Sequence, residues 1–98
     1  MKAYLIANIT VTDPERYRSY RTAVPPVAAQ YGGRFLVRAG AVHPLEGEFG
    51  FDRFVVIEFL SLEAARKFYD SPEYAPLLKL RMETTKSQVA VVEGYAPA

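Results

Sequence analysis

The sequence predicts an α+β domain in which two strand–helix–strand units build one antiparallel sheet. The first observation is the order of the elements, because segments rich in strand-forming residues alternate with segments of helical periodicity as β-α-β-β-α-β. The second is the length, since 98 residues suit a single domain spanning 1–98. The third is that the strands are apolar on both faces, so both faces of the sheet need to be covered.

The first half of the chain is expected to hold a strand, a helix and a second strand. Residues 3–10 form the first strand, and the Asp-Pro-Glu sequence at 13–15 begins the helix with a capping carboxylate and a proline suited to the first turn. The prolines at 25–26 remove backbone donors, so we expect them to divide this helix into two pieces. The glycines at 32–33 end it with a left-handed cap, and residues 34–41 form the second strand.

The second half repeats this order after a long connection. Residues 42–52 hold proline, glycine and polar residues and lead to a third strand at 53–60. Serines at the start of 61–70 and of 71–85 predict two successive helical pieces, and 86–95 closes the chain as strand four. Right-handed crossovers then give an antiparallel sheet of order 4-1-3-2, the split β-α-β or ferredoxin-like arrangement.

The apolar character of both sheet faces predicts a homodimer. Side chains alternate between the two faces of a strand, and both sets are apolar in strands one and three. In strand one, one face carries Leu5, Ala7 and Ile9 and the other carries Tyr4 and Ile6. In strand three, one face carries Val55, Ile57 and Phe59 and the other carries Phe54, Val56 and Leu60. The helices can cover one face only, so a second copy packing sheet against sheet is the simplest cover for the other. The alternative is an exposed sheet that is somewhat apolar, as on many small proteins.

Composition argues against several classes of partner and cofactor. The 12 basic and 11 acidic residues give a net charge of +1, and no basic cluster is present to meet a nucleic acid. With no cysteine and only one histidine, His43, neither a thiolate site nor a His-rich metal site can form. A haem ligand would have to be His43, which is expected in an exposed loop, so we expect no cofactor and no metal.

The cellular location is predicted from the same composition. The first eight residues lack the apolar core and cleavage site of a signal peptide, and the absence of cysteine suits a reducing compartment. The longest apolar runs fall far short of the ~20 residues that a membrane-spanning helix needs. We therefore expect a soluble cytoplasmic protein with no membrane partner.

Three polar residues interrupt the apolar strands and are the leading candidates for a site. Strict alternation places Asn8, Arg38 and Glu58 together on the face away from the helices, with Arg38 close to opposite Glu58. In a functional interpretation Arg38 holds a carboxylate or enolate, Glu58 is a base and Asn8 orients the ligand. In a structural interpretation Arg38 and Glu58 are a buried ion pair that fixes strand register.

The predicted helices supply secondary candidates. The tyrosines singled out on these helices include Tyr31, Tyr69 and Tyr74. Before them, Tyr17 and Tyr20 lie on the first helix, and Arg81 lies near the end of the last one. Tyrosines in such positions more often pack at the edge of a core with the hydroxyl in water than act as acids. An arginine near a helix end more often interacts with the helix dipole than binds a ligand. They become ligand-binding candidates if the strand residues fail.

Several stretches, in order along nearly the whole chain, are similar to one known family. They are Asp13-Pro14-Glu15 with Tyr17 and Tyr20, Gly32 to Arg38, Leu45-Glu46-Gly47, Val55 to Phe59, Tyr69 to Tyr74, Arg81, and Val92-Glu93-Gly94. On these stretches the chain resembles the family called domain of unknown function 1330. The resemblance implies a dimeric α+β barrel, in a superfamily that contains cofactor-free monooxygenases, lactone isomerases, haem enzymes and binding modules.

These observations combine into one expected function and two alternatives. The leading interpretation is a homodimer that binds a small organic acid or carbonyl compound between the sheet and the first helix. Cofactor-independent catalysis on that compound is a further possibility within this interpretation. The main alternative is a non-catalytic dimeric binding or structural module in which Arg38 and Glu58 only hold the strands together. A haem-dependent enzyme is a third interpretation, which the single His43 disfavours.

Overall fold

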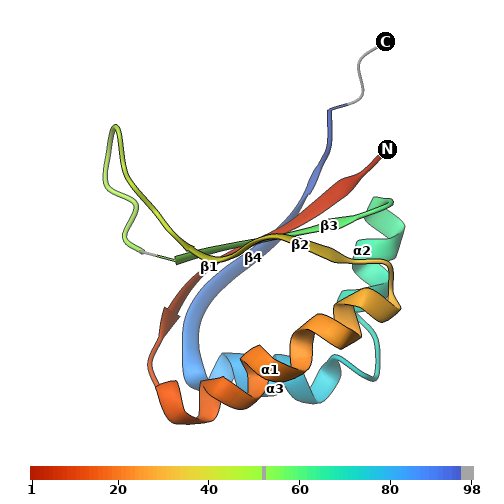
Figure 1. The fold of residues 1–98 in the computed structure, drawn as a ribbon, viewed down its shortest axis with the longest axis horizontal. Helices are drawn as coiled ribbons and strands as arrows, with labels where there is room; N and C mark the ends of the chain where they lie inside the picture. The colour runs from red at the N-terminus through yellow and green to blue at the C-terminus, as the bar shows by residue number, and fades with distance from the viewer. Residues whose placement is uncertain (52, 96–98) are drawn as a thin grey trace.

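A computed structural model of the chain describes residues 1–51 and 53–95. Within them, a four-stranded antiparallel sheet carries helices on one face (Figure 1). The elements in chain order are β1 (Ala3–Val11), α1 (Pro14–Gln30), β2 (Arg34–Ala41), β3 (Arg53–Phe59), α2 (Leu62–Tyr69), α3 (Ala75–Thr84) and β4 (Thr85–Glu93). The strand order β2-β3-β1-β4 is the predicted order 4-1-3-2 counted from the other edge, so the predicted fold is confirmed.

The core lies between the sheet and the helices. Alternate residues of the central strands β1 and β3 are buried on this face, from Leu5 and Ile9 to Ile57 and Phe59. Phe68 of α2 is only 1% exposed and packs its ring 5.4 Å from that of Phe59. Burial of such side chains, each worth roughly 1.5 to 3 kcal/mol, holds the helices on the sheet.

Helix α1 is one continuous helix, so the predicted division into two pieces is wrong. Asp13 caps its start, since its side chain accepts a hydrogen bond from the backbone N–H of Arg16 at 3.3 Å. The helix continues through Pro25 and Pro26 as far as Gln30. Proline removes a hydrogen bond but does not force a helix to end where tertiary contacts hold both sides and another donor reaches the freed carbonyl.

The end of α1 follows the prediction. Gly32 has a φ of +79°, a left-handed conformation that costs glycine no side-chain clash. The N–H of Gly33 bonds the carbonyl of Ala28 at 2.8 Å, and that of Gly32 bonds Ala29 at 3.0 Å. This cap directs the chain from α1 into β2.

The second helical region is interrupted, as the two serines predict. Ser61 caps α2, because its Oγ accepts from the backbone N–H of Ala64 at 3.0 Å. Ser71 instead organises a turn, donating to the carbonyl of Phe68 and accepting from the N–H of Tyr74, and α3 begins only at Ala75. This turn buries Tyr74 beneath α1, where the site is built.

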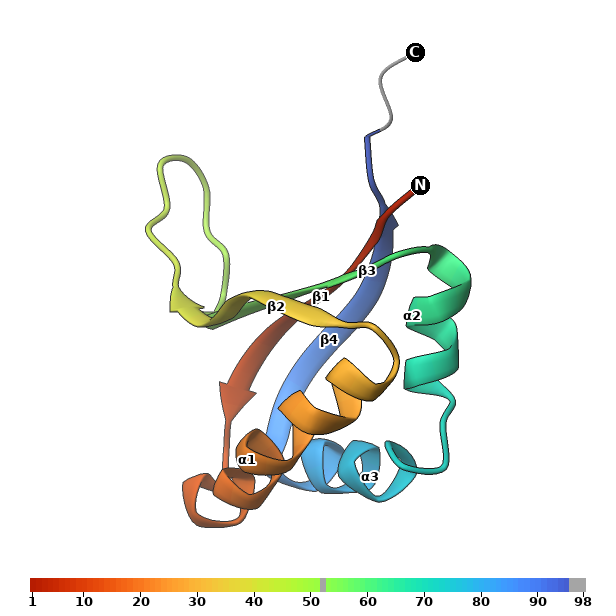
Figure 2. The ribbon, with the colours of Figure 1, turned by 45° about the vertical axis from the view of Figure 1, so that its right-hand side comes forward.

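The remaining boundaries differ slightly from those expected. β3 ends at Phe59, one residue before its predicted end, and β4 runs Thr85–Glu93, which starts one residue earlier and ends two residues earlier than predicted. The connection before β3 is a loop that extends away from the rest of the fold (Figure 2). Its last predicted residue, Asp52, lies outside the described residues. No helix in the described part of the chain is long and apolar enough to span a membrane.

The face of the sheet opposite the helices is apolar at its centre, as predicted. In the β1–β3 register Ile6 lies opposite Val56, and the side chains of Tyr4 and Phe54 lie on the same face. All four are only partly buried in the single chain. This surface, defined by Tyr4, Ile6, Phe54 and Val56, is called the open face below.

Candidate functional site

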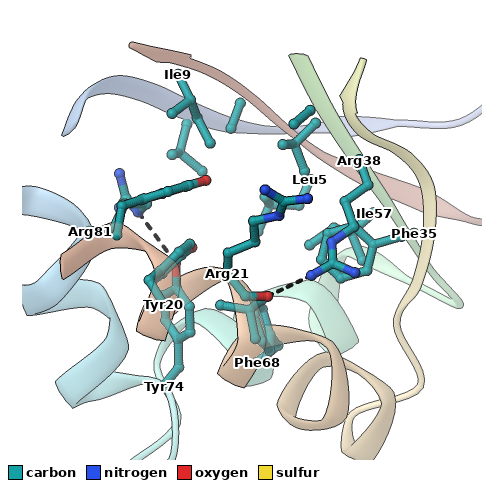
Figure 3. Close-up of a pocket in the computed structure, with 16 residues that line it drawn as sticks. Leu5, Ile9, Tyr20, Arg21, Phe35, Arg38, Ile57, Phe68, Tyr74 and Arg81 are labelled. Atoms are coloured by element: carbon teal, nitrogen blue, oxygen red, sulfur yellow. Dashed lines mark hydrogen bonds between the residues drawn. The ribbon is translucent and has the colours of Figure 1, made fainter. Parts of the chain in front are cut away.

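A cavity opens between α1 and the helix-covered face of the sheet. It holds about 50 Å³ of space that the centre of a water molecule can occupy. Figure 3 shows its lining side chains, which come from every helix and strand. They are Leu5, Ala7, Ile9, Tyr17, Tyr20, Arg21, Val24, Phe35, Arg38, Ala39, Val55, Ile57, Phe68, Tyr74, Arg81 and Val89. The wall is therefore mostly aliphatic and aromatic, with arginine and tyrosine as its polar groups and no acidic residue in this set.

Two arginines lie at the mouth of the cavity. The side chains of Arg21 on α1 and Arg38 on β2 are adjacent in Figure 3, and both residues are exposed. Arg38 donates from Nη2 to the backbone carbonyl of Arg21 at 2.6 Å, and its guanidinium carbon lies 5.7 Å from the centre of the Phe35 ring. Neither guanidinium pairs with a carboxylate in the described part of the chain.

Pro25 explains why the carbonyl of Arg21 is available to Arg38. In a regular helix this oxygen accepts from the N–H four residues later, but position 25 is proline and has none. Arg38 supplies the missing donor. Pro25, which was expected to break the helix, thus leaves free the carbonyl that holds the side chain of Arg38 at the cavity.

The prediction that Arg38 faces away from the helices is wrong. The β2–β3 register pairs Phe35 with Ile57 but Val37 with Val56, so Leu36 is an extra residue at a β-bulge. One inserted residue reverses the side-chain alternation, and Arg38 pairs with Val55, which is buried on the helix-covered face. A second bulge follows, where Ala39 has a φ of +56°.

The predicted Arg38–Glu58 pair is also absent. Glu58 lies opposite Arg34 and Tyr4, on the open face. Its carboxylate is 3.3 Å from the guanidinium of Arg34 and 3.4 Å from Lys2 Nζ. The register that would place Arg38 near Glu58 is shifted by the two bulges, so the structural interpretation of these two residues as a register-fixing ion pair is wrong.

Asn8 likewise faces away from the cavity. Its Nδ2 donates to Oε1 of Gln88 on β4 at 2.9 Å, and its Oδ1 accepts from the backbone N–H of Gln88 at 3.0 Å. It lies on the open face beside Phe54, where it borders a shallow hollow. Of the three strand candidates, only Arg38 reaches the cavity between α1 and the sheet.

The secondary candidates lie together at the buried end of the cavity. Tyr20 and Tyr74 share a hydrogen bond between their hydroxyls at 2.8 Å, and Arg81 Nε donates to the Tyr74 hydroxyl at 3.3 Å. Arg81 Nη1 also donates to the hydroxyl of Ser87. Arg81 is only 5% exposed and has no carboxylate partner among the described residues.

Burial controls the ionisation of the cavity tyrosines. Desolvation raises the pKa of Tyr20 above its ordinary value, and the neighbouring Tyr74 adds to the rise. Desolvation also raises the pKa of Tyr17, while the positive charge of Arg21, and more weakly of Arg38 and Arg81, opposes the rise. Both phenols therefore stay protonated near neutral pH, so each keeps a hydroxyl hydrogen.

One polar residue of the cavity lining, Arg21, was not identified from the sequence. Arg21 lies one helical turn after Tyr17, a spacing that places both side chains on one face of α1. Tyr74, one of the tyrosines singled out on the predicted helices, reaches the cavity through the turn that Ser71 organises. His43 is exposed in the loop before β3, and no group of three or more potential metal ligands occurs in the described part of the chain.

The chain belongs to the family described as Domain of unknown function (DUF1330), whose model matches residues 2–95. The resemblance inferred from the sequence is therefore confirmed over nearly the whole chain. No protein of curated function matches the chain significantly.

Several solved structures have a similar fold. A protein of unknown function from Rhodopseudomonas palustris has a TM-score of 0.79 at 17% identity, covering 98% of this chain and 84% of its own. A dimeric ferredoxin-like protein of unknown function from Jannaschia sp. CCS1 has a TM-score of 0.77 at 12% identity, covering 96% and 100%. SnoaB, a cofactor-independent oxygenase from Streptomyces nogalater, has a TM-score of 0.60 at 15% identity, covering 98% and 95%. At these identities the likeness shows the fold alone.

Proposed function

We propose that this protein binds a small organic anion with an apolar body in the cavity between α1 and the sheet. The observation that carries the proposal is the charge of the lining: Arg21, Arg38 and Arg81 contribute three guanidinium groups, and the lining set contains no acidic side chain. In a partly water-excluded site, a positive charge attracts an anion more strongly than in bulk water, because the surroundings screen the charge less. An anion is the partner that this arrangement favours.

The buried arginine strengthens the argument. Removing a charged group from water costs several kcal/mol unless a partner compensates for it, and the protein partners of Arg81 are neutral hydroxyls. A ligand with negative charge or a strong acceptor oxygen would supply that compensation. Functional sites commonly retain such locally unfavourable groups at a cost to stability.

The walls and the size restrict the ligand further. The space for water centres corresponds to roughly four water molecules, so only a few heavy atoms fit inside while others lie in the mouth. The side chains of Leu5, Val24 and Ile57 are apolar, so they favour contact with the carbon atoms of a ligand over contact with its polar atoms. A short aliphatic or aromatic acid meets both conditions.

Catalysis in the same cavity is the second candidate. Arg81 and the tyrosine hydroxyls are donors of the kind that stabilise an enolate or phenolate oxygen, and SnoaB, a protein of similar fold, is a cofactor-independent oxygenase. The lining set contains no carboxylate or histidine to serve as a general base, and the phenols are protonated. A substrate would have to lose its own proton readily, so binding is the better supported function.

We further propose that two copies pair through their open faces. The central apolar residues of that face, such as Ile6 and Val56, are only partly buried in one chain, and structural neighbours of the same fold are described as dimeric. Light scattering should give the mass of a dimer. Val56→Asp should give a monomer because it places a charge at the centre of the face; a monomeric parent protein would overturn the proposal.

Titration calorimetry tests the binding proposal with matched ligands. Hexanoate and benzoate should bind at least tenfold more tightly than hexanamide and benzamide, which keep the shape but lose the charge. The double variant Arg21→Gln/Arg38→Gln should lose that preference. Arg18→Gln is the control, since Arg18 is an exposed arginine of the same helix outside the cavity lining.

Two results would contradict the proposal. One is equal binding of acids and amides by the parent protein. The other is an equal loss of acid binding in Arg18→Gln, because that would indicate only a general attraction of anions to a basic surface.

A further inference from the structure

The hydrogen bonds at the buried end of the cavity leave one phenolic hydrogen without an acceptor. Tyr20 and Tyr74 together carry two hydroxyl hydrogens, and the bond between them uses one. Arg81 Nε donates its own hydrogen to the Tyr74 oxygen, so this bond uses neither of the two hydroxyl hydrogens. Whichever tyrosine donates to the other, one O–H remains available to an oxygen that the described residues do not supply.

Arg81 adds further donors at the same place. A guanidinium has five N–H groups, and two bonds, to the hydroxyls of Tyr74 and Ser87, account for the contacts of Arg81. Arg81 is only 5% exposed, and no fully buried side-chain nitrogen or oxygen in the described residues lacks a hydrogen-bond partner, so its remaining donors are open to a ligand or to water. Tyr20, Tyr74 and Arg81, called the donor cluster below, thus offer spare hydrogen-bond donors that an uncharged oxygen acceptor can satisfy.

The mouth of the cavity provides a separate and different pole. Arg38 and Arg81 lie on opposite sides of the view in Figure 3, with the guanidinium of Arg21 between them. Arg21 and Arg38 are exposed, whereas the donor cluster is buried. A carboxylate is strongly hydrated, so it is less costly to bind at the exposed pair of guanidinium groups than at the buried cluster. Apolar side chains such as Val24 and Ile57 line the space between the poles.

Resting on the function proposed above, we propose that the ligand is a bifunctional acid. Its carboxylate binds Arg21 and Arg38, an apolar carbon segment crosses the cavity, and a second oxygen acceptor, a ketone or an enolate, binds the donor cluster. The substrate class is therefore an oxo acid whose carbonyl is remote from the carboxylate.

Two matched pairs of acids test this assignment by calorimetry. Levulinate differs from pentanoate, and para-acetylbenzoate from para-ethylbenzoate, by a ketone oxygen remote from the carboxylate. A hydrogen bond to a charged donor contributes enough that the keto acid of each pair should bind about tenfold or more tightly than its partner. The ratio of the two affinities is the readout, because a loss of fold stability would lower both affinities together.

Variants at the two poles should separate their roles. Arg81→Met keeps the length and the apolar stem while removing the donors, and it should abolish the keto preference but retain binding of the plain acid. Arg38→Met should weaken both acids of a pair and keep their ratio. The double variant Tyr20→Phe/Tyr74→Phe removes both hydroxyl hydrogens and little volume, so it should reduce the ratio even if Arg81→Met fails to fold.

The outcomes distinguish this inference from the proposed function. If plain and keto acids bind the parent protein equally, the donor cluster does not read a second oxygen and the inference is wrong while the proposed function stands. If Arg81→Met and Tyr20→Phe/Tyr74→Phe leave the ratio unchanged, the second oxygen is bound elsewhere and the inference is again wrong. If no acid of either pair binds, the proposed function itself fails.

Discussion

Replacing Arg38 by methionine should destabilise the protein by an amount that depends on the residue at position 25. In the parent protein the substitution removes a charge-assisted hydrogen bond to the Arg21 carbonyl and a stacking contact with Phe35. Because the hydrogen bond lies at the surface, it is worth about 1 kcal/mol, and the stacking adds roughly 0.5 to 1 kcal/mol. The expected loss in the free energy of unfolding is therefore about 1.5 to 2 kcal/mol.

The same substitution should cost less when Pro25 is replaced by alanine. Alanine supplies the backbone N–H that the Arg21 carbonyl lacks, so Arg38 loses its role as the substitute donor and only the stacking remains. The double-mutant cycle of Arg38→Met and Pro25→Ala should thus show a coupling energy of about 1 kcal/mol.

Urea denaturation at a fixed protein concentration measures all four corners of this cycle, since association would otherwise shift the midpoints. Pro25→Ala alone should be neutral or stabilising, because it restores a helical hydrogen bond. A coupling energy near zero, with Arg38→Met equally costly in both backgrounds, would refute the idea that Pro25 positions Arg38.

Three further outcomes follow from the structure. Gly33→Ala should lower the free energy of unfolding by about 1 to 3 kcal/mol, read by thermal melting, because its Cβ would lie 2.8 Å from the ring of Phe59; an unchanged melting temperature would contradict this packing. Stability should be constant through neutral pH and fall as the pH rises above 10.0, the ordinary pKa of tyrosine, because burial raises the pKa of Tyr20 and only the unfolded chain then releases that proton; a parallel Tyr20→Phe titration should show a shallower fall. Removing Arg34 and Glu58 in a double-mutant cycle should give a coupling of only about 0.2 to 1 kcal/mol, since the pair is largely exposed on the arginine side, and a coupling of several kcal/mol would indicate burial in an assembly.

Local signals were enough to predict the architecture. Capping residues such as Asp13 and Ser61 mark the starts of helices, and Gly32 marks an end, because each acts on backbone groups within a few residues of itself. The apolar pattern of β1 and β3 is equally local, since side chains alternate strictly in strands without bulges. The strand order then follows from the handedness of the crossovers.

The candidate site was predicted only in part. Tyr17, Tyr20 and Arg81 were identified as secondary candidates and do meet in one cavity, together with Arg38. These residues come together because α1 and α3 pack against the sheet. The spacing of the residues along the chain does not indicate that packing. For the same reason the place of Arg21 at the mouth of this cavity could not be inferred from the residues around it.

The sequence by itself determined which elements form and that both faces of the sheet are apolar, because those properties arise from residues close together in the chain. Only the tertiary structure decided which face Arg38 occupies. The bulge at Leu36 is one inserted residue with no strong local signal, yet it reverses the direction of the side chains that follow it. The partner that holds Arg38 there, a carbonyl freed by Pro25, lies on another element and is brought within 2.6 Å by folding alone.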